Sequence, residues 1–315
     1  MKLLTYLHQE HENIGVLDSA GHVVDLHKAF ASYLGRVEAR PDAGPMAGAV
    51  LGRDMVDFLK RGEKALEAAR IAVAHAERHP DHSFMFERQQ VRLMAPVPRP
   101  GAVVSAGKNF SDHVSEMSSK KGPSNPVAFL KLPGSVIGPE DDIPYPAEVK
   151  NLDYEVEVAV VIGKSCIGVN PEEALNYVAG YTAFNDISAR DVIRAENQSG
   201  IHLMGKSFPG FAPMGPYLVT ADEIAEPQDL KLRLRVNGEI RQDSNLGFMI
   251  FKICDMVAYW SQMGLYPGDI LTTGTPRGVA AGRKADQTPW WLKPGDIVEA
   301  EVETIGSLRN RIVAE

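Results

Sequence analysis

The chain has 315 residues, of which 44% are hydrophobic and 23% charged, which is typical of a soluble globular protein with one large and one smaller domain, or two domains. Its net charge of −8, without a dense Lys/Arg stripe, argues against a nucleic-acid partner, and its apolar runs are too short for a membrane span or a signal peptide. Only Cys166 and Cys254 are present, which excludes a disulfide framework and indicates a cytoplasmic protein.

Residues 1–93 are predicted to form a small N-terminal α+β domain. The segments MKLLTYL, NIGVLD and HVVDL have the pattern of short strands, and residues 55–76 have the periodicity of a helix broken near Gly62. Residues 94–101, MAPVPRPG, contain three prolines, which disfavour both a helix and a central strand. We therefore expect a Pro-rich linker there.

Residues 102–315 are predicted to form the main domain, built from many short strands. Apolar alternation recurs in VAFLKL, YEVEVAVVIG, GPYLVT, LKLRLRVNG, DILTTG and DIVEAEVE. Two Pro-Gly turns, in LYPGDIL and LKPGDIV, each lead into a strand. This pattern favours a closed or folded-over β architecture over a doubly wound parallel sheet.

The first candidate site residues lie near the start of this domain. His113 and Glu116 in SDHVSEM have the i, i+3 spacing that places two side chains on one helical face. Such a pair can polarise a water, with the carboxylate orienting the imidazole; a solvated helix surface is the alternative. Residues 118–126, SSKKGPSNP, are strongly loop-like, so residues 111–126 are predicted to be a mobile lid. Lys131 ends the run VAFLK and either points into the same cavity or snorkels from a strand end.

An acidic stretch begins the strand NLDYEVEVAVVIGK, residues 151–164. Because side chains alternate along a strand, Asp153, Glu155 and Glu157 share a face that continues into a core. Neighbouring carboxylates on that face lie roughly 7 Å apart and repel by about 2 kcal/mol at an effective dielectric of about 20. A bound cation would remove the repulsion. A strand end that emerges into water is the alternative, and the stretch alone does not separate the two.

A third acid is available in GYTAFNDISARD, residues 180–191. Asp186 precedes a predicted helix start, where an aspartate is most simply a cap or turn residue. Together with the paired glutamates it makes a set of three carboxylates without a nearby His or Cys. Such a set selects Mg²⁺ or Mn²⁺ over zinc.

The loop TTGTPRG, residues 272–278, completes the candidate motifs. Its glycines allow backbone N–H groups to converge on an anion. It lacks the Lys-Ser/Thr ending of a nucleotide-binding loop, so a phosphate role is weakly supported.

Seven blocks, in order, resemble the fumarylacetoacetate hydrolase family over residues 103–314. The blocks are GKNFSDHVSEM, PVAFLKLPGSVIGPEDDI, LDYEVEVAVVIGK, GYTAFNDISARD, GKSFPGFAPMGP, VNGEIRQDSN and PGDILTTGTPRGV. The resemblance implies an α+β protein with a mixed β-roll or barrel-like catalytic domain, usually in a homodimer, and a small N-terminal α+β domain. It implies the following site residues: Glu155, Glu157 and Asp186 as ligands of Mg²⁺ or Mn²⁺, His113, Glu116, Lys131 and Lys206 as catalytic residues, and Arg190 and Thr275 as substrate contacts.

The resemblance also implies an activity on a small keto acid. We expect metal-dependent hydrolysis of a C–C bond in a 1,3-diketo acid of the acylpyruvate or fumarylpyruvate type, through a metal-bound enolate and a water activated by His113 and Glu116. Isomerisation, decarboxylation or hydration of an unsaturated 2-keto acid in aromatic-compound catabolism is the alternative. A catalytically silent metal or keto-acid binding protein is another, against which the intact His-Glu pair argues. Ile193 and Pro209 stand where many relatives have Gln and Asp, which leaves the substrate open.

Overall fold

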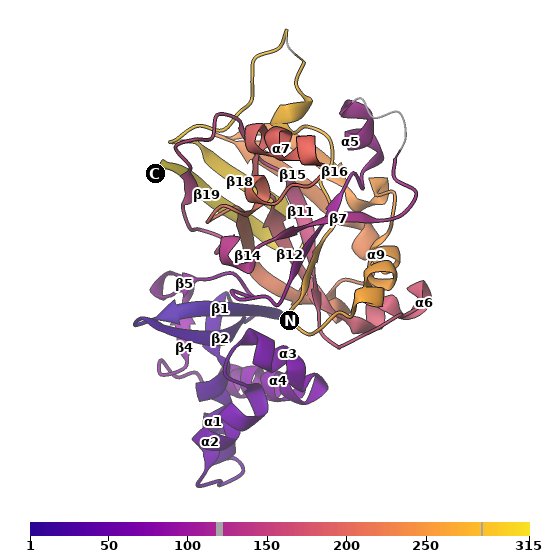
Figure 1. Ribbon diagram of the computed structural model, residues 1–315. Helices are drawn as coiled ribbons and strands as arrows, with labels where there is room; N and C mark the ends of the chain where they lie inside the picture. The colour runs from indigo at the N-terminus through magenta and orange to yellow at the C-terminus, as the bar shows by residue number, and fades with distance from the viewer. Residues whose placement is uncertain (118–121, 285) are drawn as a thin grey trace.

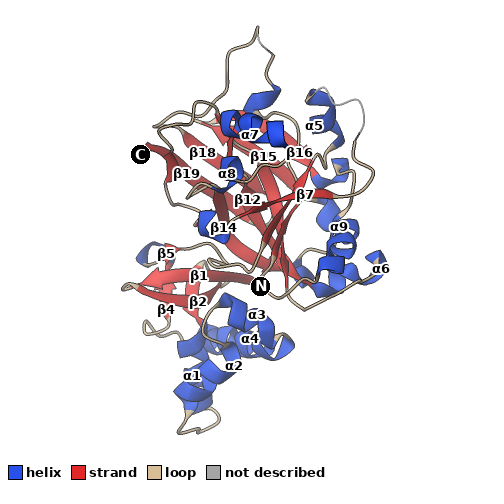
Figure 2. Ribbon diagram, in the orientation of Figure 1, coloured by secondary structure: helices blue, strands red, loops and turns tan. Residues whose placement is uncertain are grey.

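The computed structural model describes residues 1–117, 122–284 and 286–315 (Figure 1). Within these ranges, no helix is both long enough and apolar enough to cross a membrane. A smaller unit of strands and helices lies below a larger body rich in strands in the view of Figure 2.

The N-terminal unit is a short antiparallel sheet covered by four helices. Its strands are β1 (Lys2–His8), β2 (His11–Leu17), β3 (His22–Asp25), β4 (Met85–Glu87) and β5 (Arg92–Leu93), and its helices are α1 (Leu26–Arg36), α2 (Ala43–Leu51), α3 (Met55–Arg61) and α4 (Glu63–Arg78). The predicted helix break is confirmed, because α3 ends at Arg61 and α4 begins at Glu63, with Gly62 between them at a φ of 58°.

The larger body contains the remaining elements. Its strands are β6 (Val103–Gly107), β7 (Val127–Lys131), β8 (Val136–Ile137), β9 (Ile143–Tyr145), β10 (Leu152–Asp153), β11 (Val156–Ile162), β12 (Val178–Asn185), β13 (Ser188–Ala189), β14 (Ala212–Thr220), β15 (Lys231–Val236), β16 (Glu239–Asn245), β17 (Ile270–Thr272), β18 (Ile297–Val302) and β19 (Gly306–Ala314). Its helices are α5 (Ser111–Glu116), α6 (Pro171–Ala174), α7 (Arg190–Glu196), α8 (Met204–Ser207) and α9 (Ile253–Trp260).

One sheet of twelve strands joins the two units. Its order is β4-β3-β2-β1-β14-β12-β11-β17-β6-β7, with β5 paired to β1 and β8 paired to β14. The joint is the antiparallel pairing of β1 with β14, in which Lys2 lies opposite Val219 and Leu3 opposite Leu218. A second sheet of five strands has the order β16-β15-β18-β19-β9, and β10 pairs with β13.

Parallel and antiparallel pairs occur together in these sheets. β17 with β6, β14 with β8 and β19 with β9 are parallel, and the other strand pairs are antiparallel. Among the described strands neither sheet closes on itself, so the architecture is open. The expected fold, an α+β protein with a mixed β-roll catalytic domain and a small N-terminal α+β unit, is confirmed. We keep the boundaries at residues 1–93, 94–101 and 102–315 as a proposal.

Strand β11 is buried on both faces, which explains its almost purely apolar sequence. Val156, Val158 and Val160 belong to the core of the larger body. Ala159 and Val161, on the other face, belong to a core that includes α1–α4 of the N-terminal unit. The acidic end of β11 is therefore positioned by two cores at once.

Candidate active site

Three buried carboxylates meet at the beginning of β11. Glu155 is 4% exposed, Glu157 1% and Asp186 0%, and one carboxylate oxygen of each lies within 4.8 Å of the others. The strand end therefore does not emerge into water. Of the two interpretations that the sequence left open, the structure supports an acidic cavity.

Backbone pairing brings Asp186 to the glutamates. β11 and β12 pair antiparallel with Val156 opposite Asn185, so the residues just beyond each strand end are neighbours. The Asp186 N–H donates to the carbonyl oxygen of Glu155 at 2.8 Å, and the Glu155 N–H donates to Asn185 Oδ1 at 3.0 Å. These bonds fix two acids that are far apart in the sequence.

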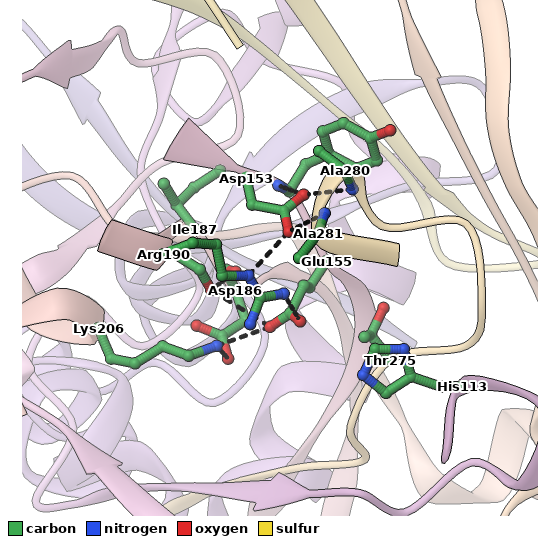
Figure 3. Close-up of polar contacts among 12 residues, drawn as sticks. His113, Asp153, Glu155, Asp186, Ile187, Arg190, Lys206, Thr275, Ala280 and Ala281 are labelled. Atoms are coloured by element: carbon green, nitrogen blue, oxygen red, sulfur yellow. Dashed lines mark hydrogen bonds and ion pairs between the residues drawn. The ribbon is translucent and has the colours of Figure 1, made fainter. Parts of the chain in front are cut away.

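Two lysines contact the carboxylates of the same cluster. Lys206 Nζ donates to Glu155 Oε2 at 2.6 Å and to Asp186 Oδ2 at 2.7 Å (Figure 3). Lys131 Nζ donates to Asp186 Oδ1 at 2.5 Å and to the carbonyl oxygen of Ile187 at 3.3 Å. Lys131 is 1% exposed, so it points into the cavity and does not snorkel from the strand end.

The three acids differ in how well their charge is compensated. Burial opposes ionisation of Glu155, but Arg190 and Lys206 outweigh it and hold its pKa well below the ordinary value. Burial raises the pKa of Glu157, and the charges of Asp186 and Glu155 raise it further. Glu157 accepts a hydrogen bond from the Gly274 N–H at 3.0 Å, and no ion pair reaches it within the described residues.

A divalent cation fits this donor set. Three oxygen-donating carboxylates are the ligands that Mg²⁺ and Mn²⁺ prefer. Glu157 is the acid whose charge lacks a partner cation, and a bound ion would supply one. The structure therefore has a buried acidic cluster that could hold a divalent metal.

Asp153 is separated from the metal cluster although it shares the alternation of Glu155 and Glu157. Its carboxylate accepts hydrogen bonds from the Ala280 N–H at 2.7 Å, the Ala281 N–H at 3.1 Å and Arg190 Nε at 2.8 Å. The other edge of the same guanidinium binds Glu155. Arg190 was expected to contact substrate; its donors instead engage two acids of the chain, and the substrate role stays a prediction.

His113 and Glu116 lie side by side on α5, as their spacing indicated. His113 Nδ1 is 3.5 Å from Glu116 Oε2 but is buried without a hydrogen-bond partner. Both Glu116 oxygens accept from the Gly278 N–H, at 3.0 and 3.1 Å. Figure 3 places His113 next to Thr275, on one side of the Glu155 network. The glutamate anchors the helix to the loop, and His113 Nδ1 faces the same glutamate without a hydrogen bond.

The loop at residues 272–278 does cradle anions, but they are carboxylates of the chain itself. The N–H of Gly274 binds Glu157 and that of Gly278 binds Glu116. Gly278 has a φ of 104°, and a Cβ there would lie 2.1 Å from the carbonyl oxygen of Arg241, so only glycine fits. The loop links the metal cluster to the helix that carries His113.

Thr275 has both of its hydrogen-bonding functions occupied. Its hydroxyl donates to the Val156 carbonyl at 3.0 Å and accepts from Gln242 Nε2 at 2.8 Å. Gln242 is buried, and its Oε1 accepts from the Val156 N–H at 2.9 Å. Sequence reasoning missed Gln242; the block VNGEIRQDSN contained it, but only the fold shows that it ties Thr275 to β11. A substrate contact by Thr275 stays a prediction.

The two departures from the family pattern lie near α8. Ile193 packs against Gly205, where a Cβ would lie 2.5 Å from Ile193 Cγ1, and so helps to position Lys206. Pro209 lies two residues beyond the end of α8. Residues 118–121 of the predicted lid lie outside the described residues, and its mobility stays a prediction.

Comparisons with known proteins agree with this geometry. Residues 102–313 match the family profile described as "Fumarylacetoacetate (FAA) hydrolase C-terminal". The chain is 46% identical over 264 residues to oxaloacetate tautomerase Fahd2a, mitochondrial, of Rattus norvegicus, covering 84% of this chain and 80% of that protein. It is 40% identical over 264 residues to oxaloacetate tautomerase YisK of Bacillus subtilis (strain 168), covering 82% and 86%.

A solved structure supports the same relationship. Fumarylacetoacetate hydrolase (EaFAH) from psychrophilic Exiguobacterium antarcticum has a TM-score of 0.76 and 32% identity, with 100% of both chains covered. The likeness therefore includes the N-terminal unit as well as the larger body.

The relatives overturn the enzyme class that the sequence suggested. Proteins 46% and 40% identical to this chain are tautomerases, and tautomerases are isomerases. The expected class, a hydrolase acting on carbon–carbon bonds, is wrong. Isomerisation, which the sequence left as an alternative, agrees better with these relatives. The catalytic roles expected for His113 and Glu116 stay predictions.

Proposed function

The chain belongs to the fumarylacetoacetate hydrolase family, and on that premise we propose that it is a tautomerase of a small 2-keto dicarboxylic acid of the oxaloacetate type. The observation that carries the proposal is the identity of 46% and 40% to two proteins named oxaloacetate tautomerase. The site supports it, because keto–enol exchange needs one proton carrier and a positive environment for the oxygen that gains charge.

The metal would be held by Glu155, Glu157 and Asp186. A divalent ion bound there would supply Lewis acidity for a 2-keto acid. Mg²⁺ and Mn²⁺ both suit the three carboxylates.

His113 is the proposed proton carrier. Its Nδ1 faces Glu116 Oε2 at 3.5 Å, so Nε2 would accept the proton that leaves C3 of the substrate. The electron pair of the broken C–H bond forms the C2=C3 double bond, and the C2 oxygen takes up a proton to give the enol. No water is consumed, and the reverse steps restore the ketone. Glu116, held by Gly278, positions the helix that carries the imidazole.

The lysines provide the positive environment. Lys206 lies between Glu155 and Asp186, whose charges outweigh the effect of burial and raise its pKa, so it stays an ammonium. Burial lowers the pKa of Lys131 despite the nearby Asp186. A fixed positive charge beside an oxygen that becomes negative stabilises the transition state, with single donors contributing up to roughly 3 kcal/mol.

The first prediction tests this function through tautomer exchange. Enol oxaloacetate is added to the protein with Mg²⁺ or Mn²⁺, and the decay of enol absorbance is followed while products are identified by mass. We expect the protein to accelerate ketonisation without splitting the carbon chain. His113→Asn should lower the catalysed rate by roughly 10² to 10⁴, the usual contribution of a positioned proton carrier.

Ser115→Ala is the matched control on the same helix. Ser115 is exposed and its hydroxyl donates to the Ser111 carbonyl, so its loss should leave the rate unchanged. A His113→Asn protein as fast as the wild type would exclude the histidine as proton carrier. A protein that binds metal and oxaloacetate but accelerates nothing would be the silent binding protein that the sequence left open.

A further inference from the structure

Glu116 also lines a large cavity of the molecule. Its volume is about 1290 Å³, and its walls come from α5, β16 and the segment after the 272–278 loop. The lining includes Glu116, Arg241, Arg277, Gly278, Arg283 and Trp290. The three carboxylates of the metal cluster are not among its lining residues, so the tautomerase site does not account for it.

Two arginines share one aromatic ring in this cavity. The guanidinium carbon of Arg241 lies 4.2 Å from the centre of the Trp290 ring, and that of Arg283 lies 3.9 Å from it. Stacking on an indole holds a guanidinium flat and leaves its edge for hydrogen bonding. Arg241 and Arg283 also line a neighbouring cavity of about 530 Å³, so the two side chains separate this cavity from the larger one.

Arg241 has more hydrogen-bonding capacity than the chain uses. Its Nη2 donates to Glu239 at 2.9 Å, and the Glu239 side chain is 60% exposed. Its Nε and Nη1 are buried and have no hydrogen-bond partner among the described residues. Buried donors without partners are unfavourable, and such a group calls for an explanation.

Two acids on the cavity wall, Glu116 and Asp243, already have partners of their own. Glu116 accepts from the Gly278 N–H. Asp243 pairs with Arg233 at 3.1 Å. Two like charges held on one ring repel each other, and an anion between them removes the repulsion. The planar fork of a guanidinium matches a carboxylate in two parallel hydrogen bonds.

We propose that Arg241, Arg283 and Trp290 form a binding site for the carboxylate of a small organic acid, separate from the metal cluster. The carboxylate takes donors of Arg241 beside the Nη2 that the exposed Glu239 now occupies, and the Trp290 ring provides an apolar wall for the adjoining methylene groups. The carboxylate belongs either to a separate dicarboxylic acid or to the far end of a long keto diacid whose other end reaches the metal cluster. The case of a long keto diacid rests on the proposed tautomerase activity, whereas the case of a separate dicarboxylic acid goes beyond it.

Succinate is the probe, because it has two carboxylates and no keto group. Its binding to the full-length, Mg²⁺-loaded protein is measured by calorimetry and by tryptophan fluorescence, with potassium chloride at matched ionic strength as the blank. We expect saturable binding to the wild type and binding at least tenfold weaker in Arg241→Gln. Arg241→Lys should also weaken it, since the charge remains and the fork is lost.

Arg309→Gln is the matched control, because Arg309 is 62% exposed on β19 and does not line the cavity. It should bind succinate as the wild type does. The proposal is overturned if Arg241→Gln binds succinate as tightly as the wild type does. It is also overturned if Arg309→Gln loses as much succinate affinity as Arg241→Gln, or if potassium chloride gives the same binding signal as succinate. If Arg241→Gln fails to fold, Arg283→Gln tests the same site from its other side.

Steady-state kinetics distinguish the two sources of the carboxylate. If the site holds the end of a long substrate, Arg241→Gln raises KM for 2-oxoadipate and leaves KM for oxaloacetate unchanged. If it holds a separate acid, both KM values stay as they are while succinate binding falls. Because binding is measured directly, failure of the tautomerase proposal leaves this test intact.

Discussion

Glu157 is the residue on which the metal proposal rests. It shares the cluster with Glu155 and Asp186, but each of those two acids contacts a lysine, whereas Glu157 receives a backbone N–H. Burial of a carboxylate without a partner cation raises its pKa, and a bound ion reverses that effect. The metal and the folded state should therefore be coupled through this side chain.

The second prediction is that Glu157→Gln abolishes stabilisation by divalent ions. Mg²⁺ at 100 times its Kd should stabilise the wild type by about 2.7 kcal/mol. Glu157→Gln should lose most of this effect, and without metal it should be at least as stable as the wild type, because a poorly compensated buried acid has been removed. Thermal unfolding with and without Mg²⁺ measures both quantities.

Glu303→Gln provides the comparison for the loss of one acid. Glu303 is 48% exposed and pairs with Lys231 at 3.0 Å, away from the cluster. Mg²⁺ should stabilise the Glu303→Gln variant as much as it stabilises the wild type. An undiminished Mg²⁺ effect in Glu157→Gln would show that Glu157 is not a ligand.

The site residues differ in how far the sequence could reveal them. Glu155 and Glu157 were found because the period of two along a strand is a local pattern, and that pattern also included Asp153, which the fold assigns to Arg190 instead. Gln242 and Arg241 are adjacent in sequence but serve different sites. No local pattern states which face of β16 meets β11 and which meets Trp290.

At the scale of a single helix, α4 connects stability to pH. His75 lies in its buried face, with Nε2 3.1 Å from the Ser32 hydroxyl oxygen of α1. Burial lowers the pKa of His75, and the charges of His79 and Arg36 lower it further. The folded state therefore binds this proton less readily than the unfolded chain, whose histidines titrate near about 6.5.

The third prediction follows from that difference. The contribution of His75 to the free energy of unfolding is constant at pH values well above the pKa of histidine in the unfolded chain. It decreases as the pH falls through that pKa, because only the unfolded state then takes up the proton. Melting temperatures measured from about pH 8 to about pH 5 should fall less steeply in His75→Gln than in the wild type. His11→Gln, an exposed histidine of β2, should leave the slope unchanged. Equal slopes in His75→Gln and the wild type would contradict the assignment.

Strand β7 has the features of an interface. It is the last strand of the twelve-stranded sheet, and Val127, Leu130 and Leu132 on and after it are 44%, 55% and 49% exposed. An apolar edge strand open to solvent is a template for pairing with another chain. We propose that it contributes to the homodimer that the sequence led us to expect.

The fourth prediction is that Leu130→Glu weakens a dimer. Light scattering at several protein concentrations should show a dimer for the wild type and a shift toward monomer for the variant, because a buried charge at an interface is unfavourable. Val37→Glu, at a 60% exposed position in the N-terminal unit, should leave the dimer intact. A wild type that scatters as a monomer at all concentrations would exclude the dimer.

Element by element, the sequence was informative wherever the signal was local. The break at Gly62 and the strand pattern of residues 151–164 were both predictable from neighbouring residues. The pairing of β1 with β14 was not, because two strands from opposite parts of the chain meet through tertiary packing, which no window of sequence contains.

That pairing makes the whole molecule one folding unit. Ala159 and Val161 of the larger body belong to the same core as Phe58 and Ala69 of the N-terminal helices. Removal of residues 1–93 would expose this core and an edge of β14. The division into two domains is therefore a proposal about chain organisation, not about independent stability.

The fifth prediction is that residues 94–315 alone do not fold stably. The truncated chain should be insoluble or melt well below the full-length protein, and calorimetry of the full chain should show one transition. A substitution in the pairing of β1 with β14, such as Leu3→Asp, should lower the melting temperature of that single transition. Two separate transitions in the intact protein would show that the units unfold independently.

The shared sheet also has a consequence for biosynthesis. The ribosome releases β1 first, and β2 and β3 follow at once, so the N-terminal hairpins can pair early. On the other edge of β1, β5 can pair with Tyr6 and Leu7 early, but Lys2 and Leu3 remain unpaired until most of the chain has emerged and β14 is present. During that interval the nascent protein presents an unpaired strand edge beside apolar residues. A holdase chaperone that protects such edges should therefore influence the yield of native protein more than its final stability.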